Sequence, residues 1–200
     1  MKKESMAIIT EYLGVEPIEI NSNLVSAQNR KRLYWTNIPM KGLPEDKGIM
    51  LKDILEPVEQ IDDAYYYSDK SIAYMERGNA KWQQAGARRA DRYTQTPDTK
   101  KAFTITANFH KGVPYNYFDD VRDKSKCVRS GGRGSYDRHE WDSVDTHHIR
   151  KLTVTECERL QTVPDGYTCG VSNTQRYKML GNGWTVDVVK HIFEGLKETA

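Results

Sequence analysis

Thirteen residues near the N-terminus, Val-Ser-Ala-Gln-Asn-Arg-Lys-Arg-Leu-Tyr-Trp-Thr-Asn at Val25–Asn37, set the architecture expected for the whole chain. The apolar and aromatic residues Leu33–Ile38 predict a β-strand that begins at Arg30. Alternate side chains of a strand point to opposite faces, so we expect Arg30 and Arg32 on one face. Two guanidinium groups there suit phosphate oxygens or the carbonyl edge of a base. A strand end with solvated charges explains the same residues, and the stretch alone leaves both interpretations open.

Upstream, the pattern predicts a helix over Lys3–Leu13 that ends at Gly14, followed by a short strand over Pro17–Ile20. The helix is indicated by apolar residues at helical spacing, which are Met6, Ile9 and Leu13. Glycine readily takes the left-handed conformation that ends a helix. The αββ opening is part of an α/β sheet rather than a complete one, because two or three short strands are marginally stable alone.

The composition is typical of a soluble globular chain, with 29% charged and 38% hydrophobic residues among 200. No apolar run approaches the ~20 residues of a membrane span, and no secretory signal is apparent. Three cysteines without a Cys-x-x-Cys pair predict neither a disulfide framework nor a zinc site, and the five histidines lack metal-ligand spacing. We therefore expect a cytoplasmic protein without a metal or a membrane partner.

Charge is unevenly distributed although the net charge is only +2. Residues 45–69 hold eight acidic and two basic residues, whereas residues 81–111 hold seven basic and two acidic ones. Residues 124–138 hold five basic residues and one acidic residue. This segregation indicates a basic face for a polyanion, although solvated charge runs explain any single segment as well.

The middle of the chain, residues 41–148, is rich in Tyr, Gly, Asp and Arg and shows no long helical periodicity. Two β-prone runs, Lys101–Asn108 and Lys126–Ser130, are predicted as strands of an irregular, loop-bearing module.

The C-terminal part predicts three helices. Thr153–Glu156 is a capping box that opens a helix through Gln161, and Pro164–Gly166 is a turn. Ser172–Gln175 is a second capping box, and its helix is expected to end at Gly181. The last helix carries one apolar stripe, for which the N-terminal sheet is the expected partner: Val186, Val189, Phe193 and Leu196.

Three motifs occur in a fixed order along the chain. Gln28–Arg32 fits Gln-x-Arg-x-Arg, and Arg150–Tyr167 fits Arg-x-Leu-Thr-x-x-Glu-x-x-Arg-Leu-Gln-x-x-Pro-Asp-x-Tyr. Gly181–Val186 fits Gly-Asn-x-x-x-Val. Each motif alone is weak, but together they resemble the C-terminal half of the bacterial and phage DNA (cytosine-5) methyltransferases. Val25–Asn37 and the helix after Trp184 are also similar to the animal de novo DNA methyltransferases.

The resemblance implies an α/β fold, the C-terminal part of a Rossmann-like S-adenosylmethionine-dependent methyltransferase domain interrupted by an irregular, β-rich target-recognition region. Residues 1–40 would supply a late helix and strands of the catalytic domain. Residues 41–148 would form the target-recognition region, and residues 149–200 would return to the catalytic domain as helices.

The chemistry implied by the resemblance is DNA methylation, as in restriction–modification systems. A cytosine is flipped out of the duplex, a cysteine thiolate adds to C6, a glutamate supports N3, and C5 takes a methyl group from S-adenosyl-L-methionine. The matching base-pocket residues in this sequence, taken as catalytic, are Gln28, Arg30 and Arg32. Arg32 is expected nearest the base.

The resemblance also implies cofactor and DNA contacts. Asn182, Gly183 and Trp184 would contact the amino-acid end of S-adenosyl-L-methionine, since glycine permits close approach and a helix N-terminus offers N–H groups to a carboxylate. A capped junction with Trp184 packed in the core is the alternative. The expected residues of the DNA-reading loop are Arg129, Ser130, Gly131, Gly132 and Arg133. A plain surface loop explains them nearly as well. The pairs Arg88/Arg89 and Lys100/Lys101 are expected to grip the DNA backbone.

Three family motifs are missing from the sequence: the glycine-rich cofactor loop, the Pro-Cys nucleophile and Glu-Asn-Val. Cys127, Cys157 and Cys169 follow Lys, Glu and Thr, so we expect no methyl transfer by this chain alone. It is interpreted as a portion that binds double-stranded DNA together with an N-terminal half or companion subunit. A catalytically dead regulatory relative and an unrelated basic nucleic-acid-binding module remain alternatives. The apolar stripe also predicts self-association of the isolated chain.

Overall fold

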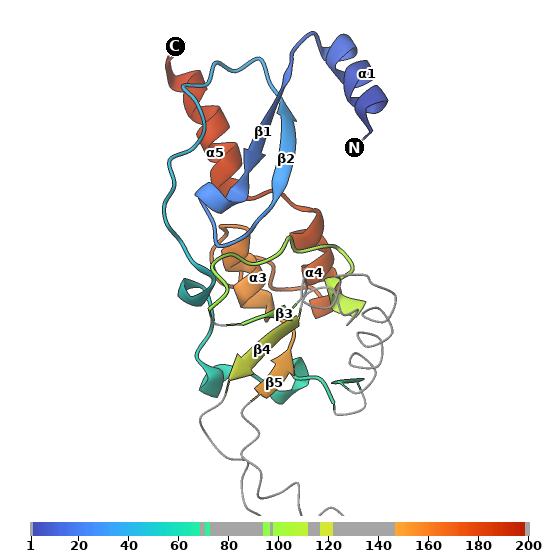
Figure 1. Ribbon diagram of the computed structural model, residues 1–200, viewed down its shortest axis with the longest axis vertical. Helices are drawn as coiled ribbons and strands as arrows, with labels where there is room; N and C mark the ends of the chain where they lie inside the picture. The colour runs from blue at the N-terminus through green and yellow to red at the C-terminus, as the bar shows by residue number, and fades with distance from the viewer. Residues whose placement is uncertain are drawn as a thin grey trace, which may run out of the picture. The chain divides into compact units, whose positions relative to one another are not determined.

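The computed structural model describes residues 2–68, 71–72, 94–96, 98–111, 117–121 and 147–198 (Figure 1). The chain divides into two compact units. The first unit comprises Met1–Glu56, Thr99–Lys111 and Val154–Ala200, and the second unit comprises Pro57–Asp98 and Gly112–Thr153. These limits differ from the predicted segments, because residues 41–56 and 99–111 belong to the first unit and residues 149–153 to the second. None of the helices within the described ranges combines the length and the apolar content needed to traverse a bilayer.

The N-terminal elements of the first unit follow the sequence pattern closely. The helix α1 spans Lys3–Leu13 and ends at Gly14, which has φ +66° and donates its N–H to the carbonyl of Thr10. The strand β1, Pro17–Asn21, pairs antiparallel with β2, Lys31–Trp35. The strand β2 is therefore shorter than the predicted strand Arg30–Ile38, and Arg30 lies just before it.

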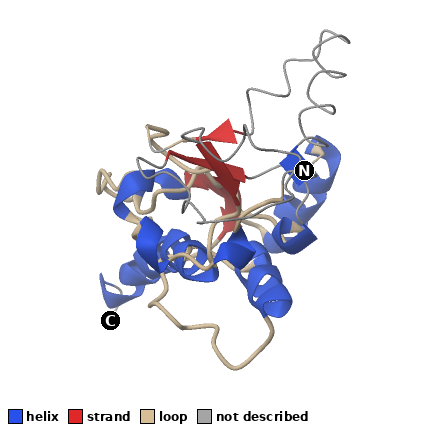
Figure 2. Ribbon diagram, turned by 90° about the horizontal axis from the view of Figure 1, so that it is seen from below, coloured by secondary structure: helices blue, strands red, loops and turns tan. Residues whose placement is uncertain are grey.

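The C-terminal helices of the first unit are α3 at Val154–Leu160, α4 at Asn173–Asn182 and α5 at Val186–Glu194. The N-cap of α4 is confirmed, because the Ser172 hydroxyl accepts the N–H of Gln175. The helix α4 ends one residue beyond the predicted end. Short 3-10 turns complete this unit, and loops make up much of the remainder (Figure 2). The turns are η1 Ser22–Leu24, η2 Leu51–Asp53, η6 Phe109–Lys111 and η7 Gly195–Glu198.

The helix α5 packs against one face of the β1–β2 pair through Val188 and Ile192, which contact Ile20 and Val25 in a buried cluster. The predicted contact of the stripe Val186, Val189, Phe193 and Leu196 with this sheet is wrong. Val186, Phe193 and Leu196 are 44%, 54% and 50% exposed. The apolar residues of α5 form one broad arc of which the sheet covers only the edge with Val188 and Ile192, so periodicity alone selected the wrong edge.

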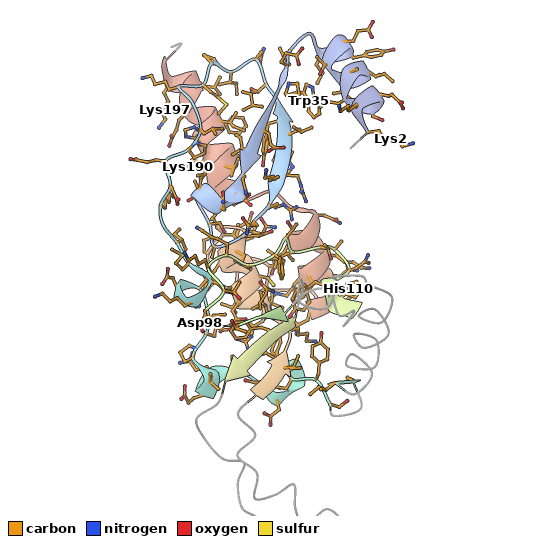
Figure 3. All side chains as sticks on the ribbon, viewed as in Figure 1. Lys2, Trp35, Asp98, His110, Lys190 and Lys197 are labelled. Carbon is orange, nitrogen blue, oxygen red and sulfur yellow. The ribbon has the colours of Figure 1, made fainter. Side chains whose placement is uncertain are left out.

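The other face of β2 is connected to α1. The Trp35 indole N–H, labelled in Figure 3, donates to the Thr10 hydroxyl at 3.0 Å. Three large apolar side chains of α1 nevertheless stay exposed, namely Ile8, Tyr12 and Leu13.

The second unit contains a small mixed sheet in the order β3–β4–β5. Thr94–Gln95 (β3) runs parallel to Tyr117–Val121 (β4), which pairs antiparallel with His147–Arg150 (β5). The buried ring of Phe118 lies beneath the Arg150 guanidinium, 4.8 Å from its carbon to the ring centre. Two 3-10 turns, η3 Val58–Gln60 and η4 Asp63–Tyr65, precede the sheet.

The two additional predicted strands have different outcomes. Lys101–Asn108 is not a strand, since its pairing is limited to one bridge between Ala102 and Gln28. Lys126–Ser130 lies outside the described residues.

Candidate functional site

Arg30 connects distant segments of the first unit. It is 3% exposed. Its Nη1 donates to the carbonyl of Ile105 at 2.9 Å, and its Nη2 donates to the carbonyls of Gly181 and Gly183 at 3.0 and 2.8 Å. The first and third sequence motifs, 151 residues apart, are therefore in direct contact through one side chain.

Arg32 does not share a surface with Arg30, which corrects the expectation of two guanidinium groups side by side. It is exposed and donates to the carbonyl of Lys31 at 2.8 Å. Because Arg32 is paired with Ile20 and Tyr34 with Ile18, Arg32 and Tyr34 share one face of β2. Arg30 precedes the strand, which is why the alternation does not apply to it.

Burial and neighbouring charges both shift the pKa values of Arg30 and Tyr34. Burial, followed by the nearby positive charge of Arg32, lowers the pKa of Arg30 to about 10. Burial raises the pKa of Tyr34, although the two arginines act in the opposite direction. Arg30 thus stays protonated at neutral pH, and only Arg32 presents its charge to solvent.

Gln28 is fully buried and links two other segments. Its Nε2 donates to the carbonyl of Leu160 at 3.3 Å, and its Oε1 accepts the N–H of Ile105 at 3.1 Å. The hydroxyl of Ser26 donates to the same Leu160 carbonyl at 2.6 Å. These contacts join the Gln-x-Arg-x-Arg stretch to the end of α3.

Gln161, for which the sequence suggested no role, holds the turn between α4 and α5. Its Nε2 donates to the carbonyl of Leu180 at 2.6 Å, and its Oε1 accepts from the Thr185 hydroxyl at 3.1 Å. Its main-chain carbonyl accepts the N–H of Val186. Gln161 belongs to the second motif, so all three motifs meet at this turn.

The start of α5 does not offer free N–H groups, contrary to the expectation for a carboxylate site. The N–H of Val186 donates to the Gln161 carbonyl, and that of Asp187 donates to the Thr162 hydroxyl at 2.9 Å. The N–H of Val188 donates to the carbonyl of Thr185. Any ligand at this turn must therefore use side chains or residues before Val186.

Asn182 and Trp184 point away from this framework. Both are exposed, and Trp184 is 64% exposed, so its predicted alternative place in the core is wrong. A hollow of about 580 Å³ is lined by Trp184 together with Val186, Val189 and Phe193. Lys190 and Lys197, labelled in Figure 3, also line it.

Gly181 marks a close approach of two segments. A Cβ atom at this position would collide with the main chain of Thr106 and Ala107. The first glycine of the Gly-Asn motif is therefore required for packing of α4 against the segment that also supplies the Ile105 carbonyl.

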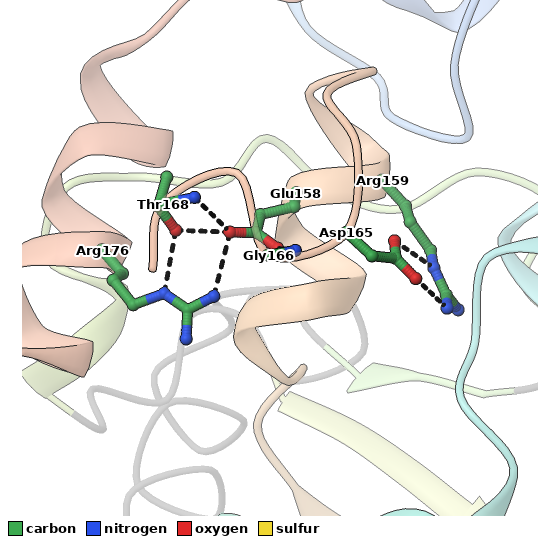
Figure 4. A network of polar contacts seen from close by, with 6 residues as sticks. All are labelled: Glu158, Arg159, Asp165, Gly166, Thr168 and Arg176. Atoms are coloured by element: carbon green, nitrogen blue, oxygen red, sulfur yellow. Dashed lines mark hydrogen bonds and ion pairs between the residues drawn. The ribbon is translucent and has the colours of Figure 1, made fainter. Parts of the chain in front are cut away.

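A buried polar network stabilises the loop between α3 and α4 (Figure 4). The Glu158 carboxylate accepts from the N–H groups of Gly166 and Thr168, the Thr168 hydroxyl and the Arg176 guanidinium, the last at 2.9 Å. Burial alone would raise the pKa of Glu158, but these hydrogen bonds outweigh it and lower the pKa. Nearby, Arg159 holds Asp165 through two hydrogen bonds.

We expect this network to make unfolding depend on pH in the acid range. A carboxylate whose pKa is lower in the folded state stabilises the fold above its ordinary pKa, and the stabilisation is lost as the pH falls through the folded value. The unfolding free energy of the wild type should therefore fall as the pH is lowered below about 4.5. Glu158→Gln should be less stable at neutral pH and show a smaller decline. Urea unfolding between pH 2 and pH 7 measures both, and an unchanged pH slope would contradict the assignment.

Lys101 is not available to grip DNA, which corrects that prediction. Its ammonium donates to the carbonyls of Asn23, Ser26 and Ile49 at 2.7, 3.1 and 2.6 Å. It therefore connects its own loop to two other segments of the first unit, the turn Asn23–Ser26 and the loop at Ile49. Lys100 is exposed, and its proposed contact with DNA stays a prediction.

The remaining predicted DNA contacts lie outside the described residues. They are Arg88, Arg89, Arg129, Ser130, Gly131, Gly132 and Arg133.

Comparison with protein families gives a match to the model for C-5 cytosine-specific DNA methylases over residues 21–198. The type II methyltransferase M.HpaII of Haemophilus parainfluenzae is 28% identical, over 94% of this chain and 52% of that protein. M.Bsp6I of a Bacillus species is 25% identical, over 84% of this chain and 50% of that protein. The chain thus spans about half the length of these relatives.

The fold is similar to that of two solved methyltransferases. The Entamoeba histolytica methyltransferase EhMeth superposes with a TM-score of 0.60 and 16% identity, over 95% of this chain and 58% of that one. The S. pombe Dnmt2 methyltransferase gives a TM-score of 0.57 at 16% identity, over 98% of this chain and 63% of that one.

Proposed function

The chain belongs to the C-5 cytosine-specific DNA methylase family, and on that premise we propose that it is the portion of a DNA (cytosine-5) methyltransferase that recognises the target and completes the cofactor site. The observation that carries this proposal is the contact of Arg30 with the carbonyls of Gly181 and Gly183. It brings the predicted base-pocket and cofactor motifs together. A family match over most of the chain argues against an unrelated basic nucleic-acid-binding module.

In the proposed enzyme Arg32 holds the flipped cytosine or its phosphate. Its guanidinium is exposed at the beginning of β2, whereas three of the donor contacts of Arg30 are used by main-chain carbonyls. Gln28 has both ends of its amide engaged with Leu160 and Ile105. Arg32 is accordingly the one of these three residues that can touch DNA, while Gln28 and Arg30 build the framework behind it.

Members of this family use S-adenosylmethionine, which supplies the methyl group. The residues of this chain fit the amino-acid end of such a molecule. Asn182 offers an exposed amide and Trp184 an exposed indole, one on each side of Gly183. We propose that these three residues bind and orient the methyl donor from one side.

The nucleophile and the other wall of the cofactor site are proposed to come from a second polypeptide or an N-terminal half. The sequence has no Pro-Cys and no Glu-Asn-Val. An apolar surface is exposed beside the proposed cofactor residues, formed by Val186, Val189 and Phe193. We propose that the second polypeptide docks there and that the chain alone is inactive. Double-stranded DNA is the proposed substrate, read through residues 129–133 in the cytoplasm.

The test is reconstitution. The chain is mixed with the polypeptide encoded by a neighbouring reading frame that carries the glycine-rich loop, Pro-Cys and Glu-Asn-Val. Transfer of labelled methyl from S-adenosylmethionine to duplex DNA is then measured. Each polypeptide alone should give background and the mixture clear incorporation. Activity of this chain alone would contradict the proposal. Stimulation of an intact, already active methyltransferase without reconstitution would instead support the regulatory alternative.

A further inference from the structure

Arg30 is fixed at its main chain as well as at its guanidinium. Its N–H donates to the Asn21 side chain at 2.9 Å, and its carbonyl accepts from the N–H and the hydroxyl of Ser22. The side chain therefore extends from a fixed main-chain position to the carbonyls of Gly181 and Gly183.

The acceptors of Arg30 are carbonyl dipoles. Among the ion pairs formed by the described residues, none pairs a carboxylate with this guanidinium. A buried charge is costly unless hydrogen bonds compensate it, so the three carbonyls are held in the orientation that compensates. The guanidinium group is planar and its N–H donors point in fixed directions. It therefore constrains two carbonyls of one turn more tightly than a neutral side chain could.

Both flanks of the turn are thus held while its centre is exposed. Arg30 binds the Gly181 and Gly183 carbonyls, and Gln161 binds Leu180 and Thr185. Between them, the side chains of Asn182 and Trp184 point to solvent.

We infer that Arg30 is a positioning residue that fixes the conformation of the turn Gly181–Thr185, so that Asn182 and Trp184 are held ready for a ligand before it binds. A site preorganised in this way spends less of the binding free energy on ordering itself. That the ligand is the methyl donor rests on the proposed function. The rigidity of the turn does not.

Amide hydrogen exchange of the isolated full chain tests the inference. In Arg30→Met, exchange at the N–H groups of Gly183 and Asp187 should accelerate about tenfold or more relative to the amides of α3, which corresponds to about 1.4 kcal/mol. These N–H groups donate to the Met179 carbonyl and the Thr162 hydroxyl, and both bonds depend on the conformation of the turn.

Arg176→Met is the matched control. It removes a partly buried arginine of α4 itself, whose contacts are Glu158 and Thr168. It should lower the melting temperature without selective acceleration at Gly183 and Asp187. Equal acceleration in both variants, or none in Arg30→Met, would overturn the inference.

If Arg30→Met does not fold, Arg30→Lys provides the test. Lysine keeps the charge but lacks the planar set of donors that binds the three carbonyls. Selective acceleration of exchange at Gly183 and Asp187 should therefore persist at reduced size. Wild-type exchange in this variant would overturn the inference. Because exchange requires neither DNA nor methyl donor, its failure is distinguishable from failure of reconstitution.

Discussion

Replacing Arg32 with alanine is expected to lower kcat/KM for methyl transfer by the reconstituted enzyme about 10²–10³-fold. Removing one preorganised donor from a reacting group typically has an effect of this size. Arg32 is the exposed member of the Gln-x-Arg-x-Arg pair, and its guanidinium makes one hydrogen bond to a neighbouring carbonyl. Its loss should therefore leave the fold intact. Initial rates on duplex DNA at saturating S-adenosylmethionine measure the effect, and circular dichroism checks the fold.

Lys31→Ala is the matched control for this change. Lys31 is exposed on the opposite face of β2 and forms a surface ion pair with Glu19, with 3.3 Å between Nζ and Oε1. Such pairs contribute little, so activity should change less than about threefold. If Arg32→Ala and Lys31→Ala have equal effects, the proposed contact of Arg32 with the base or phosphate is wrong.

Phe193→Glu is expected to weaken association with the complementary polypeptide about 100-fold. Phe193 is 54% exposed and lines the hollow with Trp184 and Val189. A carboxylate introduced there must be desolvated when a partner covers the surface. Aromatic residues at the centre of an interface commonly account for losses of this size when changed. Sedimentation velocity or titration calorimetry with the purified partner measures the dissociation constant.

Met179→Glu provides the comparison for Phe193→Glu. Met179 is 50% exposed on α4 and does not line the hollow. The Met179→Glu change introduces the same charge at a similarly exposed apolar residue. It should leave the dissociation constant within about twofold of the wild-type value. Equal losses in both variants would assign the effect to net charge and remove the proposed docking surface.

The family and several elements were predictable from the sequence because their signals are local. A glycine stop ended α1 as expected, and serine capped α4. The order of the three motifs predicts the methyltransferase family, and the family match over residues 21–198 confirms it.

The edge of the apolar arc of α5 that faces the sheet could not be predicted, because the arc is wider than the surface that the sheet covers. Val188 and Ile192 are buried, while Val186 and Phe193 remain exposed. Choosing between two apolar stripes requires knowledge of the partner surface, which local sequence does not contain.

The partners of the charged residues Arg30 and Lys101 also could not be predicted from the sequence. Both were predicted to face nucleic acid, and both donate to main-chain carbonyls far away in sequence. A cation that binds carbonyls leaves no complementary side chain in the sequence. Such contacts therefore carry no pattern that distinguishes them from solvated or DNA-facing charges.

The second unit is built from two separated stretches of chain, and this limits how recombination can exchange it between homologous proteins. Pro57–Asp98 contributes β3, and Gly112–Thr153 contributes β4 and β5. Thr99–Lys111 between them belongs to the first unit and carries the Lys101 and Ile105 contacts. A productive graft must therefore transplant both stretches together and retain the recipient's intervening thirteen residues. A single-crossover chimera would separate β3 from its sheet.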